Sequence, residues 1–542
     1  MEILFLISFC LALIVSLILI PVLIKISSHL KLVDNPEGSS RKLHSAPIPR
    51  SGGLAIILSA AIALLLALPN EESLYSFIFS CLIIVGFGLL DDLVELKPLS
   101  KLGGQALGVG VAMAGGMVIT DLPFLSDAPL WFCYLLTFFF VMGVINGVNF
   151  SDGMDGLAAG TTLMAMVVIF VIALESNNTQ VAAIALAICA ALVGFLRFNT
   201  HPAVIFMGDA GSQFLGFTVA WLAITLSQDP GSQISVLMPL LILGIPVMDI
   251  LQVVPVRIKK KLPLPGPDKE HFHHQIAKLG FYQAEVVATI YVLQFVLLGG
   301  AYQLRFSADH IVLGFYALFA ISVLGVIYLA NVTGWKLRPD STNQEWERRN
   351  LFLRRFGRFH PYSGKFYGIS ISLFLLLASF ASVGMTTGLR YIALVWAVIL
   401  LITHLASMNR WPLLLGRLSS YTATVFSVFG LTLSVQSEPM SLAINYFIGV
   451  LVVLLAISVL TTRKEYFWFT PQDLLVMFFI VLLAPQLPLE FGANVQVGEL
   501  IFRTFVLLYA CEYVLARGDQ ARSRLTYASI LSLAVLGAYA LF

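Results

Sequence analysis

The sequence predicts an all-α, polytopic integral membrane protein. Of its 542 residues, 58% are hydrophobic and only 11% are charged, and the mean hydropathy is +0.90. Soluble domains carry about 25% charged residues, and a chain this apolar could not cover a water-exposed surface. These values exclude a soluble enzyme and a disordered chain. The net charge of +2 gives no bulk attraction to nucleic acid, so we expect no nucleic-acid partner.

Apolar runs long enough to cross a bilayer recur along the whole chain. A spanning helix needs about 20 such residues, and the runs predict about 18 helices. The first run lacks a small-residue cleavage site and ends at Lys25, so we interpret it as a retained span. The predicted spans lie near 3–24, 53–69, 75–90, 104–120, 128–145, 157–175, 180–196, 210–227, 234–254, 282–302, 309–331, 367–385, 389–407, 416–434, 442–461, 468–487, 499–515 and 526–541.

The longest polar stretch, 335–366, divides these helices into two groups. We predict an eleven-helix module over 1–331, a basic cytoplasmic linker over 332–366, and a seven-helix module of unknown function over 367–542. Lys and Arg gather in alternate loops, notably 25–52, 255–281 and 332–366. Positive loops stay on the cytoplasmic side, which places the N-terminus outside.

Four polar groups fall on the face that the charges assign to the cytoplasm. An ionised Asp at the bilayer centre costs about 2.5–3.5 kcal/mol, and most of that penalty vanishes at a helix end. The groups are Asp91–Asp92, the segment from Asn146 to Gly156, the segment from Asn199 to Ser212, and the segment from Asp268 to His274.

Local structure is expected to present several of these side chains together. Asp209 lies near the start of a predicted span, where free amides stabilise a carboxylate. Asp152 and Asp155 share one face if a helix begins near Ser151. Neighbouring glycines such as Gly153 let the backbone approach a ligand.

Carboxylates at a membrane edge suit Mg²⁺, which binds through one or two of them plus substrate phosphates. With His271, His273, His274 and Arg257 nearby to hold phosphate oxygens, the set indicates phosphoryl transfer involving a membrane lipid. Simpler interpretations stay open: the acidic pair as solvated helix caps, the histidines as a zinc site, and 259–261 as a lipid anchor.

In this order along the chain, the motifs resemble those of the polyprenyl-phosphate N-acetylhexosamine-1-phosphate transferases. The matching segments are Asp34-Asn35-Pro36, Arg41 to Pro49, Gly52-Gly53, Asp91-Asp92, Asn146 to Gly156, Asn199, Phe206 to Ser212, Pro246 to Asp249, Arg257, and His271-Phe272-His273-His274.

The resemblance implies that a polyprenyl phosphate attacks the β-phosphate of a UDP-N-acetylhexosamine, giving a polyprenyl-diphospho-sugar and UMP. It assigns Asp209 as the Mg²⁺ ligand, with Mn²⁺ as an alternative ion. It gives the acceptor phosphate to Asp91 and Asp92, with Asp91 as a candidate base for that phosphate and a metal contact from Asp92. It places the nucleotide pocket and the diphosphate and sugar clamp at two further sets of residues. The pocket residues are Asn146, Asn149, Asp152, Gly153, Met154, Asp155, Asn199 and Phe206; the clamp residues are Arg257, His271, His273 and His274.

Phe272 interrupts the histidines and Glu95 follows the aspartate pair, features that resemble the N-acetylglucosamine branch of the family. That branch implies undecaprenyl phosphate as acceptor, a bacterial inner membrane with a cytoplasmic active site, and the first step of a lipid-linked envelope glycan such as an O-antigen. The family also implies a homodimer.

Two other functions remain as alternatives. A secondary transporter of a sugar phosphate or organic anion would place polar groups near the bilayer midplane on broken helices, whereas here they lie at one edge. A scaffold with an inactive site would not need so complete a polar set.

Overall fold

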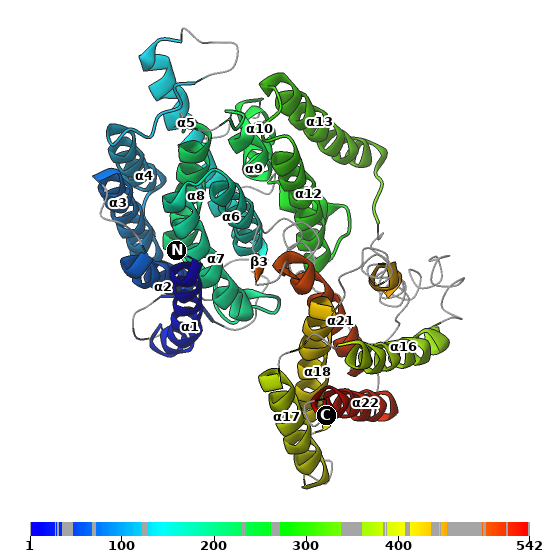
Figure 1. Cartoon of the computed structure of the whole chain (residues 1–542). Coiled ribbons are helices and arrows are strands. Elements are labelled where there is room, and N and C mark those ends of the chain that lie inside the picture. Colours follow the sequence, from blue (N-terminus) through cyan, green and yellow to red (C-terminus); the bar gives the residue numbers. More distant parts are fainter. Residues whose placement is uncertain are drawn as a thin grey trace. The chain divides into compact units, whose positions relative to one another are not determined.

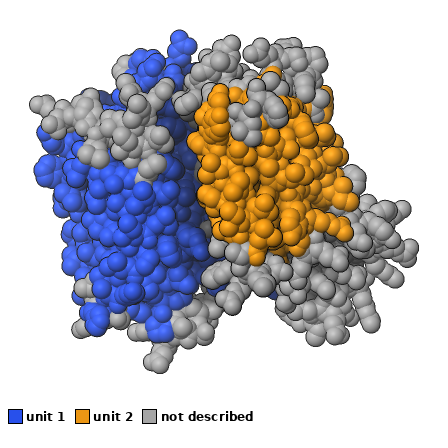
Figure 2. All heavy atoms as spheres, turned by 60° about the horizontal axis from the view of Figure 1, so that its bottom comes forward, with its two compact units in different colours: residues 1–339, 470–475 blue, residues 340–469, 476–542 orange. Residues whose placement is uncertain are grey.

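The computed structural model divides the chain into two compact units (Figure 2). Unit 1 comprises Met1–Pro339 and Thr470–Leu475, and unit 2 comprises Asp340–Phe469 and Val476–Phe542. The structure describes residues 2–27, 29, 32–34, 47–67, 72–121, 128–229, 231, 233–259, 261, 271–337, 360–382, 385, 387–406, 412–434, 444, 446–451, 490–491, 495–515 and 519–539.

Unit 1 is built almost entirely of helices (Figure 1). They are α1 (Glu2–Ile26), α2 (Gly52–Ala67), α3 (Glu72–Val94), α4 (Pro98–Ala114), α5 (Leu130–Ser151), α6 (Leu157–Glu175), α7 (Thr179–Asn199), α8 (Gly208–Ser227), α9 (Met238–Ile242), α10 (Gly244–Lys259), α11 (Phe272–Lys278), α12 (Gln283–Gln303) and α13 (Asp309–Thr333).

Among the described residues of both units, 8 helices are long and apolar enough to cross a membrane, which makes this a multi-pass membrane protein. They are α3, α5, α6, α7, α8, α12, α13 and, in unit 2, α17 (Thr387–Ala406). The predicted helical membrane fold is confirmed, whereas the predicted number of about 18 spans stays a prediction.

Helix α8 lies at the centre of unit 1. In its most apolar stretch 94% of the residues are buried inside the protein, against 17% in the corresponding stretch of α13. It packs against α2, α3, α5 and α6 (Figure 1). Glycines allow two of these approaches. A Cβ on Gly53 of α2 would lie 2.4 Å from Gly211 Cα of α8, and one on Gly88 of α3 would lie 2.6 Å from Ala210 Cα. The start of α8 is therefore in near-backbone contact with two other helices.

A short antiparallel pair of strands precedes α2. Strands β1 (Val33–Asp34) and β2 (Ile48–Pro49) pair Val33 with Pro49, and Asp34 forms an ion pair with Arg50. Residues 35–46, which carry much of the first motif, lie outside the described residues.

The predicted single span over 234–254 is wrong, because the chain breaks between α9 and α10 at Leu243. Neighbouring helices bind the carbonyls at the break. Gln294 Nε2 of α12 donates to Ile242 O at 3.0 Å, and the Tyr316 hydroxyl of α13 donates to Gly244 O at 3.1 Å. Broken helices persist inside membranes where such partners satisfy the backbone.

In unit 2 the described helices pack around α22 (Asp519–Ala538), with Leu507, Cys511 and Leu533 in the core. Buried hydroxyls join the helices; Ser532, for example, donates to Leu375 O at 2.9 Å. The predicted linker over 332–366 overlaps the end of α13 and the start of α16, while 338–359, and most of the predicted spans 442–461 and 468–487, lie outside the described residues. The elements are α16 (His360–Ala381), α17 (Thr387–Ala406), α18 (Pro412–Ser434), β3 (Glu490–Phe491), β4 (Val495–Gln496), α21 (Val497–Leu515) and α22 (Asp519–Ala538); β3 and β4 are antiparallel.

The contact of α2 with α8 gives a direct test of the fold. We expect Gly53→Ala to lower the free energy of unfolding by about 1–3 kcal/mol, because the added methyl would force two backbones apart. Gly314→Ala is the control, since a Cβ there meets nothing within 4 Å and alanine favours a helix. Thermal unfolding in detergent compares the two; an equal effect would contradict the packing.

Candidate active site

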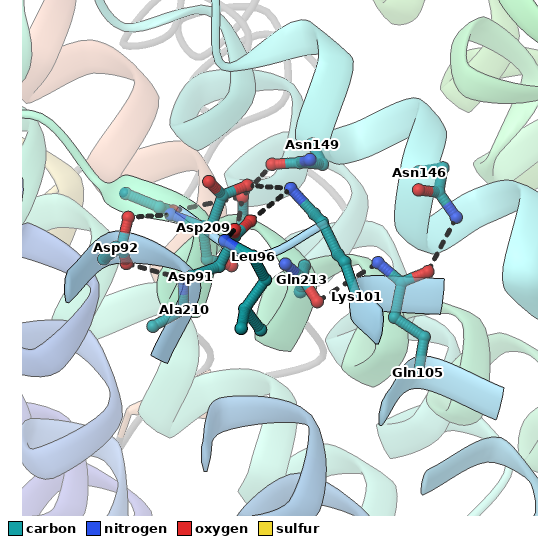
Figure 3. Close-up of polar contacts among 12 residues, drawn as sticks. Asp91, Asp92, Leu96, Lys101, Gln105, Asn146, Asn149, Asp209, Ala210 and Gln213 are labelled. Atoms are coloured by element: carbon teal, nitrogen blue, oxygen red, sulfur yellow. Dashed lines mark hydrogen bonds and ion pairs between the residues drawn. The ribbon is translucent and has the colours of Figure 1, made fainter. Parts of the chain in front are cut away.

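The Asp92 carboxylate connects the end of α3 to the start of α8 (Figure 3). Its Oδ1 accepts the Asp209 N–H at 2.8 Å, and its Oδ2 accepts the Ala210 N–H at 3.0 Å. The first amides of a helix lack partners within that helix and attract a negative charge. The position predicted for Asp209, in the first turn of a helix, is confirmed. The group that accepts the free amides, however, is Asp92.

Lys101, one turn into α4, lies between two carboxylates (Figure 3). Its ammonium group hydrogen-bonds to Asp209 Oδ1 and lies 3.0 Å from Asp91 Oδ2. Burial alone would lower the pKa of Lys101, but Asp209 and Asp91 outweigh burial and hold that pKa above its usual value. Asp91 is fixed from its other oxygen, which accepts the Leu96 N–H at 2.7 Å. Asp91 and Asp209 therefore face the same cation, whereas Asp92 is bound by the amides of α8.

Below this ion pair lies a second polar contact between the same helices. Gln105 Nε2 donates to Gln213 Oε1 at 3.1 Å, one turn along α4 and α8 from Lys101 and Asp209. Asn146 of α5 donates to Gln105 Oε1 at 2.8 Å, so it lies beyond Gln105 from the carboxylates (Figure 3). The structure thus brings Asn146 into an amide cluster within the helix bundle.

Asn149, one turn later on α5, does reach the start of α8. Its Oδ1 accepts the Ser212 hydroxyl at 2.6 Å, and Ser212 lies three residues after Asp209. The end of α5 therefore lies beside the carboxylates.

Asp152 and Asp155 do not lie on a helix, because α5 continues to Ser151 and α6 begins only at Leu157. The condition for a shared helical face is not met. Residues 152–156, which include Gly153 and Met154, form a turn instead. Asp155 Oδ2 contacts His201 Nδ1 at 2.7 Å and accepts the Ala203 N–H at 3.1 Å.

Asp152, at the start of the turn, interacts electrostatically with the carboxylate cluster. Desolvation, together with the negative charges of Asp209 and Asp92, raises the pKa of Asp152 well above its usual value. The positive charge of Arg50 opposes this increase. Asp152 is therefore influenced by the charges of the cluster, whereas Asp155 contacts His201 and the backbone of Ala203.

Asn199 and Phe206 form hydrogen bonds to backbone groups of neighbouring segments. Asn199 Oδ1 accepts the Gly156 N–H at 3.0 Å, and its Nδ2 donates to Ile205 O at 2.9 Å. The Phe206 N–H donates to Pro49 O at 2.7 Å. Asn199 fixes the end of the 152–156 turn, and Phe206 connects the start of α8 to β2.

The histidines are positioned by an acidic residue of α10. Asp249 Oδ2 contacts His271 Nδ1 at 2.8 Å, and its Oδ1 accepts the Phe272 N–H at 2.6 Å. The His271 ring packs on Phe150, with ring centroids 4.3 Å apart. This contact places the histidines beside the end of α5. Arg257, also on α10, is buried.

His273 lies against the 152–156 turn, since its Nε2 is 3.1 Å from the position a Cβ would take on Gly153. This nitrogen is buried and has no hydrogen-bond partner among the described residues. Burial, with the nearby His274 and His271, lowers the pKa of His273 to about 3. His273 is therefore neutral near pH 7. It can donate one hydrogen bond and accept another, but it offers no positive charge to a phosphate.

Two residues of this site were not among the predicted site residues. Lys101 lies ten residues after Asp91, and in the sequence it was one of two lysines following the pair. Asp249 belonged to a matched motif but carried no role. Their partners are 108 and 22 residues away along the chain, so only the fold reveals the contacts.

The fold and site define a multi-pass membrane protein whose spanning helices bring carboxylates, a lysine and histidines together at their ends. Residues 74–227 match the model of glycosyl transferase family 4, a range that runs from α3 through α8 and contains the carboxylate cluster.

Three relatives show how far the similarity extends. A probable undecaprenyl-phosphate N-acetylglucosaminyl 1-phosphate transferase of Bacillus subtilis is 33% identical, over 60% of this chain and 92% of its own length. A decaprenyl-phosphate N-acetylglucosaminephosphotransferase of Mycobacterium leprae is 31% identical, over 49% and 75%. An undecaprenyl-phosphate alpha-N-acetylglucosaminyl 1-phosphate transferase of Escherichia coli K12 is also 31% identical, over 49% and 75%. The chain therefore belongs to glycosyl transferase family 4 and is a transferase.

The buried, neutral His273 predicts a pH-dependent stability. The pKa of His273 is 6.5 in the unfolded chain and about 3 in the folded protein. Between these two pH values His273 is protonated only in the unfolded state, so the free energy of unfolding decreases as the pH falls. We expect His273→Gln to reduce the difference in melting temperature between pH 8 and pH 5. His310→Gln, at an exposed imidazole of α13, is the control. A pH difference unchanged in His273→Gln would contradict this environment.

Proposed function

We propose that this protein transfers N-acetylglucosamine-1-phosphate from UDP-N-acetylglucosamine to undecaprenyl phosphate. An oxygen of the lipid phosphate forms a bond to the β-phosphorus of the donor, the bond from that phosphorus to the bridging oxygen breaks, and UMP leaves. The product is undecaprenyl-diphospho-N-acetylglucosamine. The printed names of the relatives, which specify prenyl-phosphate acceptors and N-acetylglucosamine, support this choice.

The observation that carries the proposal is the position of the Lys101 ammonium between Asp91 and Asp209 at the ends of membrane helices. Lys101 offers a fixed positive charge to a phosphate, while the carboxylates offer oxygens to a cation. A lipid phosphate lies at the edge of a bilayer, so an acceptor in the membrane could reach these groups without leaving it.

The carboxylates also fit Mg²⁺. Among the described residues, no three His, Cys, Asp or Glu side chains form a group that could hold a metal alone. Mg²⁺ commonly binds through one or two carboxylates, with substrate phosphates and water completing its shell. Asp209, whose side chain faces a cation, is the proposed principal ligand, with Asp92 as a second. When bound, the ion would neutralise charge on the donor diphosphate.

The protein groups then position charge more than they transfer protons. A phosphate monoester has a second pKa of about 6, so the acceptor is largely ionised near neutrality and needs little help from a base. Asp91 is fixed by the Leu96 N–H and by Lys101 and would orient the acceptor. Aligning two anions and compensating their charge is the main catalytic task, since preorganised positioning and electrostatics supply most of such rate increases.

The donor would lie along the 152–156 turn. We place the nucleotide near Asn149, Asp155 and the segment held by Asn199, and the diphosphate near Arg257. The neutral His273 suits the polar but uncharged groups of the sugar. Asp249 keeps His271 in place by accepting two hydrogen bonds from the segment that starts α11.

The setting follows from the lipid substrate. We propose the inner membrane of a bacterium, a cytoplasmic active site, and the first step of a lipid-linked envelope glycan such as an O-antigen. A homodimer remains part of the proposal. A transporter would need polar groups near mid-membrane, but the carboxylates lie at helix ends and the helix break at Leu243 is closed by Gln294 and Tyr316.

Transfer of labelled N-acetylglucosamine-1-phosphate from UDP-N-acetylglucosamine to lipid by the purified protein tests the proposal. With Mg²⁺ we expect label in the lipid and release of UMP. We expect Asp209→Asn to lower kcat about 100-fold or more, because it removes a charge aimed at the reacting groups. Asp229→Asn, beyond the opposite end of α8, should keep wild-type turnover. No labelled lipid with any UDP-amino sugar, or equal activity of the two variants, would refute the assignment.

A further inference from the structure

Gly156 is held through both of its backbone polar groups. Its N–H donates to Asn199 Oδ1 at 3.0 Å, and its carbonyl oxygen accepts the Tyr291 hydroxyl at 2.6 Å. The same carbonyl accepts the Gly160 N–H at 2.9 Å, the first turn of α6. Gly156 has a φ of +78°, a left-handed conformation that favours glycine. Three separate segments thus fix one residue at the end of the 152–156 turn.

Tyr291 reaches this carbonyl from α12, which packs against α6 (Figure 1). The Tyr291 side chain is almost fully buried. Its ring lies directly over Gly160, where a Cβ would come within 1.8 Å of the hydroxyl oxygen and 2.3 Å of Cζ. A residue with any side chain at position 160 would displace the ring. Gly160 therefore provides the space that lets a tyrosine of α12 reach the turn.

The residues between Asp152 and Gly156 are few, so a displacement of Gly156 moves the whole turn. At its other end, Gly153 lies against the buried His273 Nε2. Asp155 depends on its position for the contacts with His201 and Ala203. The proposed donor groups of the turn thus take their positions from Gly156, which in turn is held by Asn199 and Tyr291.

We propose that the Tyr291 hydroxyl is a positioning group for the donor-binding turn 152–156. Its loss weakens binding of the nucleotide sugar and leaves the rate of the bound substrate almost unchanged, because the carboxylate cluster of α3, α4 and α8 does not depend on it. The inference rests on the proposed function for the identity of the donor. It adds a residue of α12 whose hydroxyl donates to the backbone of the turn and not to a carboxylate or a histidine.

The chain offers a matched control for the general cost of losing a buried hydroxyl. Tyr316 is also buried, and its hydroxyl also donates to a glycine carbonyl, Gly244 O at 3.1 Å. That glycine begins α10 at the helix break and not at the 152–156 turn. Tyr316→Phe therefore reproduces the loss of one buried hydrogen bond without touching the turn.

The experiment compares Tyr291→Phe, Tyr316→Phe and wild type as full-length purified proteins. It measures KM for UDP-N-acetylglucosamine, kcat, and the equilibrium Kd of UMP in the absence of lipid. We expect Tyr291→Phe to raise KM and the Kd of UMP about 3- to 10-fold, the range of one hydrogen bond, with kcat within about 2-fold. Tyr316→Phe should leave all three at wild-type values while its melting temperature falls similarly.

Two results would overturn the inference: an unchanged Kd of UMP in Tyr291→Phe, or the same increase in both variants, which would indicate a structural role only. The failure of the proposed function is distinguishable. If wild type transfers nothing to lipid but binds UMP, the function fails while the UMP comparison still decides the role of Tyr291. If wild type does not bind UMP, both proposals are wrong.

Discussion

The two hydrogen bonds from the first amides of α8 to the Asp92 carboxylate determine how the rest of the site is arranged. Four acidic side chains, including Asp91, Asp152 and Asp209, gather around this point and repel one another. The amide dipoles at the helix start take up the charge of Asp92, and Lys101 takes up that of Asp91 and Asp209. Without these partners, the carboxylates could not remain together at the helix ends.

The close packing around α8 makes these contacts precise. Gly53 and Gly88 let α2 and α3 approach the backbone of α8, so the amides of Asp209 and Ala210 lie where Asp92 ends its helix. Gln105 and Gln213 form a second contact between α4 and α8 one turn from Lys101 and Asp209. A site on rigid helix ends requires little rearrangement to bind a substrate, and such preorganisation suits the proposed phosphoryl transfer.

Next to the 152–156 turn, burial keeps a histidine side chain uncharged. Asp249 accepts hydrogen bonds from both His271 and the backbone of Phe272, while His273 is enclosed and neutral. The cluster predicted from the sequence as a phosphate clamp therefore contains at least one imidazole that is neutral near pH 7. The turn therefore lies close both to the charged groups at the start of α8 and to a neutral imidazole of α11.

Much of the fold could be predicted from the sequence, because a membrane-spanning helix requires a continuous run of apolar residues that is visible in the local hydropathy. The helix ends near Asp91, Asn199 and Asp209 were placed within a few residues, whereas the helix that carries Asn149 continues to Ser151, six residues beyond its predicted end at 145. What local pattern could not reveal were partners distant in the chain: the contact of Lys101 with Asp209 joins residues 108 positions apart. The break at Leu243 was hidden because its polar atoms are satisfied by other helices.

The turn at Asp152 and the separation of Asn146 from Asn149 were missed for a related reason. A run of glycines and polar residues is compatible with a helix start or with a turn, and only the packing of neighbouring helices decides between them. Asn146 and Asn149 are three residues apart on α5, yet one contacts Gln105 and the other Ser212. The direction of each side chain depends on which helix lies opposite.

Accessibility labelling of single cysteines in sealed membrane vesicles tests most directly whether these helix ends share one side of the membrane. In a background without the native cysteines, Glu95→Cys reports the end of α3, His201→Cys the end of α7, and Phe306→Cys the connection of α12 and α13; all three positions are exposed. We expect an impermeant maleimide to label 95 and 201 from the same side and 306 from the other. Labelling of 95 and 201 from opposite sides would contradict a single site.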